Sequence, residues 1–387
     1  MRILGACSLG GAGHWRPLSV LLAAAVECGH DVLVVGPPAV RTMVELDGFS
    51  FVAGDEPPES AIAPIRERLP TAPAEEASRL GNRELFARLA ATAMLPCVAG
   101  VGDRWKPDLV LREPCEYASA IVAHDLGLRS AQVAISLADV ESGSLRVASP
   151  ALEEHRHGLT SEIGAAPYLS RFPATVDPSP FPNTVRYREV ASSDGPPLPD
   201  WWTGSTAPLV YVTLGTVLPH MSFAADQFRM VIEVLADLEV RVLIATGTFL
   251  EPARLGALPA NVHVERWVDH AQVFSAAEAV ICHGGSGTVF GALEAGVPLV
   301  VIPSFADQFA NGRLVARHGL GEVVEPSSNG GDRDDDRRTI GRSDLPRLRG
   351  AIRAVLTSDS HRTHARAFGG DQATRPTAPE VLARLGA

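Results

Sequence analysis

The feature that most constrains the fold is the segment "VICHGGSGTVFGALEAGVPLVVIPSFADQFANG", which spans residues 280–312. It contains an apolar strand, a histidine followed by small residues, a helix, and a second apolar strand that leads to an Asp-Gln pair. Strands without polar alternation that are joined by a helix are typical of a parallel sheet covered on both faces. The segment therefore predicts an α/β protein.

The same pattern recurs in both halves of the chain. "RILGACSLGGAGHWRPLSVLLAAAVECGHDVLVVG" reads as strand, glycine loop, helix and strand, with Pro17 in the first helical turn and Gly29 at the helix end. "PDLVLREPCEYASAIVAHDLGLRSAQVAI" repeats it. After residue 208, "LVYVTLGT", "VRVLIATG", "VHVERW" and "PLVVIP" are further buried-type strands. We expect two doubly wound, Rossmann-like parallel sheets.

A chain of 387 residues suits two domains. "SSDGPPLPDWWTGSTAP", at residues 192–208, is rich in Pro, Gly and Ser and lacks helical or strand periodicity, which is typical of a domain boundary. We predict an N-terminal domain at 1–190, a linker at 191–208, a C-terminal domain at 209–360, and a terminal helix at 361–387 that crosses back. Open α/β sheets bind ligands beyond the carboxyl ends of their strands, so two of them should place a cleft there.

Charge and composition exclude several partners. The formal net charge of -11 offers no basic face for nucleic acid or an anionic membrane. No apolar run is expected to reach membrane-spanning length, and the N-terminus reads as a strand, not a signal peptide. The five cysteines contain no C-x-x-C pair, which argues against disulfides or a zinc site and favours a reducing, cytoplasmic location. The Asp-rich run 328–338 is interpreted as a solvated loop and not a metal motif.

Two glycine-rich loops differ in what they can bind. "GGAGHW" lacks the third glycine of a dinucleotide fingerprint, and no P-loop pattern occurs. "HGGSGT", at 283–288, gathers backbone N–H groups at a helix start, which favours a phosphate group. Taken singly, His283 could be a strand-end histidine and Thr216 a helix cap.

At this point a resemblance becomes specific. "RWVDHAQVF" followed by "HGGSGTVFGALEAGVPLVVIPSFADQFANG" closely resembles the donor-binding motif of inverting, GT-B-fold nucleotide-sugar glycosyltransferases. It is most similar to the bacterial type that glycosylates macrolides, polyketides and other antibiotics with dTDP- or UDP-sugars. "GGAGHWRPL" resembles the acceptor-side loop of that family with its catalytic histidine, and the likeness spans nearly the whole chain.

The resemblance implies roles for the donor-site residues. A tryptophan stacks on the nucleobase, the next residue offers its backbone, small residues and a histidine hold the diphosphate, and an Asp-Gln pair binds the sugar with a supporting asparagine. By position these are Trp267, Val268, Thr216, His283, Gly285, Ser286, Gly287, Thr288, Asp307, Gln308 and Asn311. Without the motif, Trp267 would be interpreted as a core aromatic.

The catalytic residues implied on the acceptor side are His14 and Glu113. His14 lies in the first glycine loop and can act as a general base near neutral pH, and a carboxylate behind it would fix its tautomer. The family commonly has aspartate where this chain has Glu113, so Glu116 stays open as the partner. The structural alternatives are a helix-entry residue for His14 and a surface charge for Glu113.

The resemblance implies a metal-independent, inverting hexosyltransferase. It would move a sugar, expected to be a deoxysugar, from a dTDP- or UDP-sugar to a hydroxyl of a small apolar aglycone, with no other cofactor. Gly291 favours dTDP, because UDP-using relatives often carry glutamate there, although Glu294 could substitute. The acceptor should lie on irregular segments at 54–89 and 136–181. A nucleotide-sugar epimerase, a non-catalytic partner protein and a homodimer remain open alternatives.

Overall fold

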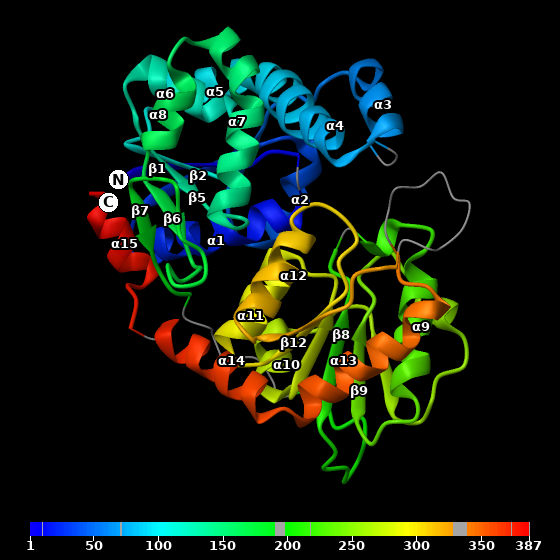
Figure 1. The fold of residues 1–387 in the computed structure, drawn as a ribbon. Helices are drawn as coiled ribbons and strands as arrows, with labels where there is room; N and C mark the ends of the chain where they lie inside the picture. Colours follow the sequence, from blue (N-terminus) through cyan, green and yellow to red (C-terminus); the bar gives the residue numbers. More distant parts are fainter. Residues whose placement is uncertain are drawn as a thin grey trace. The chain divides into compact units, whose positions relative to one another are not determined.

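A computed structural model describes residues 1–9, 11–69, 72–189, 198–216, 218–327, 339–372 and 374–386 (Figure 1). The chain divides into two compact units. Unit 1 comprises Met1–Glu189 and Arg375–Ala387, and unit 2 comprises Val190–Thr374. The expected linker is described only from residue 198, and the Asp-rich run 328–338 lies outside the described residues.

Unit 1 is built on a seven-stranded sheet in the order β3-β2-β1-β4-β5-β6-β7, in which all neighbouring strands are parallel. Its strands are β1 (Arg2–Ala6), β2 (Asp31–Gly36), β3 (Ser50–Ala53), β4 (Leu109–Arg112), β5 (Arg129–Val133), β6 (Tyr168–Ser170) and β7 (Thr184–Arg186). Its helices are α1 (Ala12–Glu27), α2 (Arg41–Leu46), α3 (Glu59–Arg68), α4 (Ala74–Ser78), the π-helical η2 (Arg79–Ala90), α5 (Ala91–Trp105), α6 (Ala118–Leu126), α7 (Ala138–His155), α8 (Leu159–Ala165) and α15 (Ala378–Arg384).

Unit 2 is built on a six-stranded parallel sheet in the order β10-β9-β8-β11-β12-β13. Its strands are β8 (Leu209–Thr213), β9 (Arg241–Ala245), β10 (Val262–Glu265), β11 (Ala279–Cys282), β12 (Leu299–Val301) and β13 (Gly321–Val323). Its helices are α9 (Ala224–Leu235), α10 (His270–Ala276), α11 (Ser286–Glu294), α12 (Gln308–Arg317), α13 (Leu345–Thr357) and α14 (Asp359–Gln372). The predicted fold class, two doubly wound parallel sheets, is confirmed.

Helix α1 shows how the sequence pattern produces the packing. Leu18, Leu21, Leu22 and Ala25 recur at helical spacing and are all fully buried. Burying each leucine contributes about 1.5–3 kcal/mol, so this face fixes α1 to the sheet. The helix ends at Glu27, and Gly29 follows the C-cap with a φ of 81°, in the left-handed region that glycine adopts without a steric penalty.

The strand order of each sheet predicts one position for a ligand. β1 has β2 on one side and β4 on the other, and β8 likewise lies between β9 and β11. The strands that follow β1 and β8 in the chain thus lie on both sides of these central strands, and open α/β sheets bind ligands beyond the carboxyl ends of strands at such a point. The register pairs Ala6 with Arg112 in unit 1 and Thr213 with Cys282 in unit 2. Residues that follow these pairs must lie close together.

The segments predicted to hold the acceptor are largely helical. α3, α4 and η2 occupy most of 54–89, and α7 and α8 occupy much of 136–181, so the expectation of irregular structure is wrong. α4, η2 and α5 form a continuous helical run, Ala74–Trp105, which by length and composition alone could cross a membrane. A core helix of a folded domain passes the same test, and Leu80, Ala87 and Val98 of this run are buried in unit 1. The expectation about run length is nevertheless wrong.

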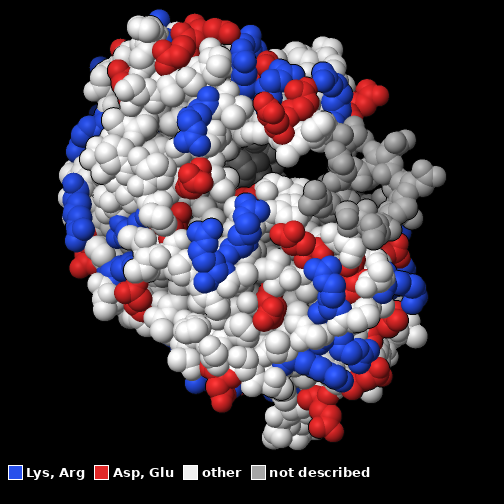
Figure 2. Space-filling view, in the orientation of Figure 1, with Lys and Arg blue, Asp and Glu red and all other residues white. Residues whose placement is uncertain are grey.

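The C-terminal segment divides between the two units. α14 belongs to unit 2, where an added Cβ at Gly369 would lie 2.7 Å from the carbonyl oxygen of Glu294. α15 belongs to unit 1, where Val381 and Leu382 join the core that contains α1. Figure 2 shows Lys and Arg side chains interspersed with Asp and Glu over the described surface of the face drawn.

Candidate active site

His14 lies in the first turn of α1 and not in the preceding loop. Gly11 caps the helix with a φ of 68°, and its carbonyl accepts from the backbone N–H groups of His14 (3.1 Å) and Trp15 (3.0 Å). Trp15 is fully buried and donates its indole N–H to Asp47 at 2.7 Å. These contacts fix the position of the helix start. The helix begins at Ala12, so Pro17 lies inside it and not, as was expected, in its first turn.

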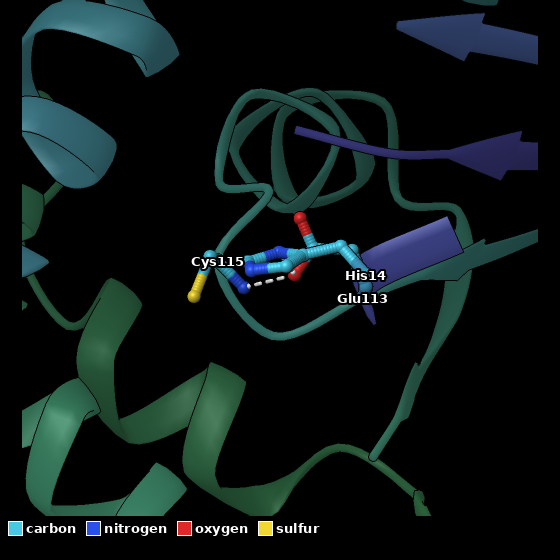
Figure 3. Close-up of side chains that lie close together, drawn as sticks. All are labelled: His14, Glu113 and Cys115. Carbon is cyan, nitrogen blue, oxygen red and sulfur yellow. Dashed lines mark hydrogen bonds and ion pairs between the residues drawn. The ribbon is translucent and has the colours of Figure 1, made fainter. Parts of the chain in front are cut away.

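Glu113 lies directly beyond β4, and its carboxylate is held on both oxygens. Oε1 accepts from the Ser8 N–H at 3.0 Å and Oε2 from the Cys115 N–H at 2.7 Å (Figure 3). Oε2 also lies 3.1 Å from Nδ1 of His14. The Glu113 side chain is 0% exposed, so the alternative of a surface charge is wrong. The structure thus brings the two predicted catalytic residues together.

The environment of Glu113 keeps it ionised. Burial alone would raise the pKa of this carboxyl, but the charge of His14, its hydrogen bond, and the bonds from Ser8 and Cys115 together lower the pKa below its ordinary value. An ionised carboxylate beside Nδ1 favours the tautomer with a proton on that nitrogen. The Nε2 atom is then the basic position of the imidazole.

The carboxylate of Glu116 binds the start of α6. Its carboxylate accepts a short hydrogen bond from the Ser119 hydroxyl and a 3.0 Å bond from the Ser119 N–H at the start of α6. Burial raises the pKa of Glu116, in contrast to that of Glu113. The geometry therefore pairs His14 with Glu113, whereas Glu116 binds the start of α6.

Arg112 is a site residue that sequence reasoning missed. It is 1% exposed, and one guanidinium nitrogen donates to the carbonyls of Glu113 (2.9 Å), Pro114 (3.1 Å) and Glu116 (2.8 Å). A second nitrogen donates to Gln132 at 3.0 Å. The arginine thereby fixes the turn that carries Glu113. An arginine at the last position of an otherwise apolar strand is the signal that could have indicated it.

Phe86 is a second residue that was missed. Its ring stacks on the imidazole of His14 with centroids 5.8 Å apart and an interplanar angle of 29°. Phe86 lies in η2, and π-helical turns are frequent at functional sites because they redirect side chains. Nothing in the local sequence pattern distinguishes this turn from an ordinary α-helix.

His283 lies at the end of β11 between two glycines of unit 2. A Cβ added at Gly215 would lie 2.5 Å from the His283 ring, and one at Gly285 would lie 2.4 Å from it. Both positions must therefore be glycine for the imidazole to sit where it does. Burial lowers the pKa of His283 to about 4, although the Asp307 charge and the Thr213 backbone oppose this effect. The ring is neutral near pH 7 and has one N–H to donate.

The start of α11 offers its backbone to a ligand. Gly285 is the N-cap, and around Gly287 no atom lies within 4 Å of an added Cβ. A ligand can therefore approach this backbone closely. The side chains of Ser286 and Thr288 are buried, so the backbone of this turn, with the positive end of the helix, is what the predicted diphosphate site presents.

Asp307 belongs to a network at the starts of α11 and α12. Its Oδ2 accepts from the Ser286 hydroxyl at 2.8 Å and from the Asn311 amide at 3.2 Å, and Asn311 also donates to the Gly284 carbonyl at 2.8 Å. The preceding residue, Ala306, has a φ of 53°, which is strained for a residue with a side chain. The network holds this strained turn in place.

The side chain of Gln308 is more buried than that of Asp307. It is 4% exposed, and its Oε1 accepts from the N–H groups of Ser304 (2.9 Å) and Phe305 (3.2 Å). The side-chain oxygen therefore supports the loop after β12. Of the pair, Asp307 is the more accessible to a ligand.

Trp267, Val268 and Thr216 occupy the remaining predicted positions. Trp267 is 71% exposed, so the alternative of a core aromatic is wrong. The side chain of Val268 is buried, and Asp269 then begins α10 by accepting from the Ala271 N–H at 2.9 Å. Thr216 is exposed in the turn after β8. A large exposed ring beside an anchored helix start is suited to stacking on a planar ligand.

Metal-ligating side chains gather at one place within the described ranges. Atoms of His14, Glu113 and Cys115 that can bind a metal lie within 4.8 Å of one another (Figure 3). No metal site was predicted from the sequence, and Cys115 was not a site candidate.

Family models match nearly the whole chain. Residues 8–215 match the N-terminal domain, and residues 229–387 the C-terminal domain, of the "Erythromycin biosynthesis protein CIII-like" family. An L-demethylnoviosyl transferase of Streptomyces niveus is 31% identical over 99% of this chain and 97% of its own length. The elloramycin glycosyltransferase ElmGT of Streptomyces olivaceus is 32% identical over 85% of this chain and 87% of its own length.

Solved structures give the same result. The glycosyltransferase SnogD from Streptomyces nogalater matches with a TM-score of 0.76 and 26% identity, covering 100% of this chain and 98% of that protein. The spinosyn rhamnosyltransferase SpnG, at 21% identity and a TM-score of 0.77 over 100% of both chains, shares the fold. The chain therefore belongs to the erythromycin biosynthesis protein CIII-like family, the antibiotic-biosynthesis glycosyltransferases that transfer sugars to natural-product aglycones.

Proposed function

We propose that this chain transfers a deoxysugar from a dTDP-sugar to a hydroxyl of a small apolar aglycone with inversion at the anomeric carbon. His14 is the general base and Glu113 is the carboxylate that orients it. The observation that carries this proposal is the 3.1 Å contact between Nδ1 of His14 and Oε2 of the fully buried Glu113. Such a pair positions an imidazole to accept a proton.

The chemical step needs a proton acceptor on the aglycone side. As the acceptor oxygen forms its bond to C1 of the sugar, its proton moves to Nε2 of His14, and the bond from C1 to the diphosphate oxygen breaks. The imidazolium that forms is stabilised by the Glu113 carboxylate, to which Nδ1–H donates. Attack from the face opposite the diphosphate inverts the configuration at C1.

The leaving diphosphate needs charge stabilisation in unit 2. The N–H of neutral His283, the amides from Gly285 to Thr288 and the positive end of α11 can supply it. Trp267 would stack on the base with the Val268 backbone at its edge, Thr216 would contact phosphate, and Asp307 would bind sugar hydroxyls. Gln308 would support the Asp307 loop and offer its amide nitrogen.

Because protein groups supply this stabilisation, we expect transfer to proceed without a metal ion. The initial rate in excess EDTA should equal the rate with added magnesium. Deleting Asp332 to Arg338, which lie outside the described residues, should change the rate little. An inactive chelated enzyme that recovers with magnesium would overturn this part of the proposal.

Donor preference rests on Gly291 in α11. An added Cβ there would lie 2.7 Å from the Phe274 ring, so the space that a glutamate would need is occupied. A UDP ribose then lacks a charge-assisted partner at position 291, a loss of about 1.5–3 kcal/mol. SsfS6 and SpnG, which share this fold at 24% and 21% identity, were solved with thymidine diphosphate. At these identities the likeness supports the shared fold and not the donor preference of this chain.

We therefore expect dTDP to bind at least as tightly as UDP in calorimetric titrations. Gly291→Glu by itself will collide with Phe274, so the informative variant is Gly291→Glu with Phe274→Ala, compared with Phe274→Ala alone. The double variant should shift the affinity ratio toward UDP. Tenfold tighter UDP binding by the unaltered chain would contradict the expectation.

The acceptor is expected to bind in unit 1 near His14. A small pocket there is lined by apolar residues such as Leu9, Met94 and Tyr117 and also by Cys115, Asp55 and Glu116. We further propose that the chain acts in the cytoplasm.

Two alternative functions are compatible with parts of this proposal. An epimerase would change the nucleotide-sugar without an acceptor, and a non-catalytic partner would change neither substrate. The relatives reported above are named as transferases, which favours neither alternative. Product analysis of the purified chain distinguishes all three.

A further inference from the structure

Cys115 has no part in the reaction proposed above, yet its sulfur lies beside the two residues that do. Metal-ligating atoms of His14, Glu113 and Cys115 fall within 4.8 Å of one another. We propose that these three side chains form a binding site for Zn²⁺ and similar thiophilic ions, and that occupation of this site inhibits transfer. The inhibition, but not the site, rests on the proposed role of His14.

The donor set selects the ion. Imidazole nitrogen, carboxylate oxygen and thiolate sulfur together are typical ligands of zinc, whereas magnesium prefers oxygen ligands and retains water. Three protein ligands leave a fourth tetrahedral position for water. His14 and Cys115 are partly exposed, so an ion and its water can enter from solvent.

The geometry is close to what tetrahedral zinc requires. Zinc bond lengths place nitrogen and oxygen ligands about 3.3 Å apart, and nitrogen and sulfur ligands about 3.6 Å apart. Nδ1 of His14 and Oε2 of Glu113 are already 3.1 Å apart. The candidate ligand atoms of all three residues already lie within 4.8 Å of one another, so a side-chain rotation of Cys115 can bring its sulfur to bonding distance of the ion.

The carboxylate is held in advance. The Ser8 N–H fixes Oε1 of Glu113, and the Cys115 N–H fixes Oε2 at 2.7 Å. Because both carboxylate oxygens are held by backbone N–H groups, Glu113 needs no large movement to bind an ion. Hydrogen bonds of this kind around a ligand raise metal affinity, as they do in natural sites.

A metal ion bound at this site would prevent His14 from acting as the base. The Cys115 thiol releases one proton to solvent when its sulfur binds the ion. Coordination through Nδ1 of His14 shifts the imidazole proton to Nε2. A protonated Nε2 cannot accept the proton of the acceptor hydroxyl, so transfer stops while donor binding in unit 2 continues.

The test uses the purified full chain without bound metal and cadmium as the probe, because cadmium thiolates absorb in the ultraviolet. Cys115→Ser is compared with the matched variant Cys97→Ser, whose thiol donates to the Ala53 carbonyl and lies outside the cluster. We expect Cys115→Ser to lose a cadmium absorption that Cys97→Ser retains. Zinc should also inhibit Cys115→Ser at a concentration at least about tenfold higher than it does the unaltered chain.

The melting temperature of Cys115→Ser without metal should match that of the unaltered chain, which shows that the variant is folded. Magnesium should neither inhibit transfer nor displace cadmium. Identical cadmium titrations for Cys115→Ser and the unaltered chain would overturn the site. A Cys115-dependent cadmium signal in an enzyme that stays fully active under saturating zinc would support the site and contradict His14 as the base.

Discussion

Replacing His14 with alanine should lower the rate of sugar transfer by about a hundred- to ten-thousand-fold, the usual contribution of a general base. Donor affinity should remain nearly unchanged, because His14 belongs to unit 1 and the predicted donor residues to unit 2. Steady-state kinetics and calorimetric titration with dTDP measure the two quantities separately. A loss of rate without a loss of donor binding is the signature of a missing base.

His124→Ala is a matched control. His124 lies in the same unit and also pairs with a carboxylate, that of Glu162, but it is on α6 outside the site. It should retain normal turnover. Near-normal turnover of His14→Ala would refute the assignment of the base.

Glu113→Gln should lower the transfer rate, although by less than His14→Ala does, because it changes the partner of the base and not the base itself. Glutamine keeps the size of the side chain, so the Ser8 N–H can still find an acceptor. The substitution removes the negative charge that stabilises the imidazolium 3.1 Å away. Kinetics at fixed pH, with donor affinity measured as before, report this loss.

Glu116→Gln separates the two candidate carboxylates. Glu116 accepts a hydrogen bond from Ser119 at the start of α6. Its replacement should therefore lower the melting temperature and have little effect on the transfer rate. If Glu116→Gln slows transfer more than Glu113→Gln does, Glu113 is not the partner of His14.

The parts of the fold that could be predicted are those with a strong local pattern. Apolar strands such as β8, β9 and β11 are fully buried or nearly so along their lengths, and their sequences show it. The short strand β6 and the edge strands β3, β7 and β13 were missed, because SFVA, YLS, TVR and GEV each include a polar or charged residue and none lies in a longer apolar run. The helical character of 59–90 was missed because its apolar face is weak.

Residues near the site were predicted where a motif carried them and missed where only the fold brings them in. His14 and Glu113 are 99 positions apart, and their contact depends on the pairing of β1 with β4. Arg112 and Phe86 act on this pair through contacts that no motif records. The conflict between Gly291 and Phe274 likewise arises from packing between α10 and α11.

The central claim is that this chain by itself transfers a sugar from a nucleotide-sugar to an aglycone, with His14 as the base. Mass spectrometry of reactions that contain the purified chain, a panel of dTDP- and UDP-sugars and candidate apolar aglycones tests it most directly. The account predicts an aglycone ion heavier by one glycosyl residue, together with free nucleoside diphosphate, and far less of that ion with His14→Ala at the same reaction time. Equal product from both proteins, or a nucleotide-sugar isomerised without any acceptor, would contradict it.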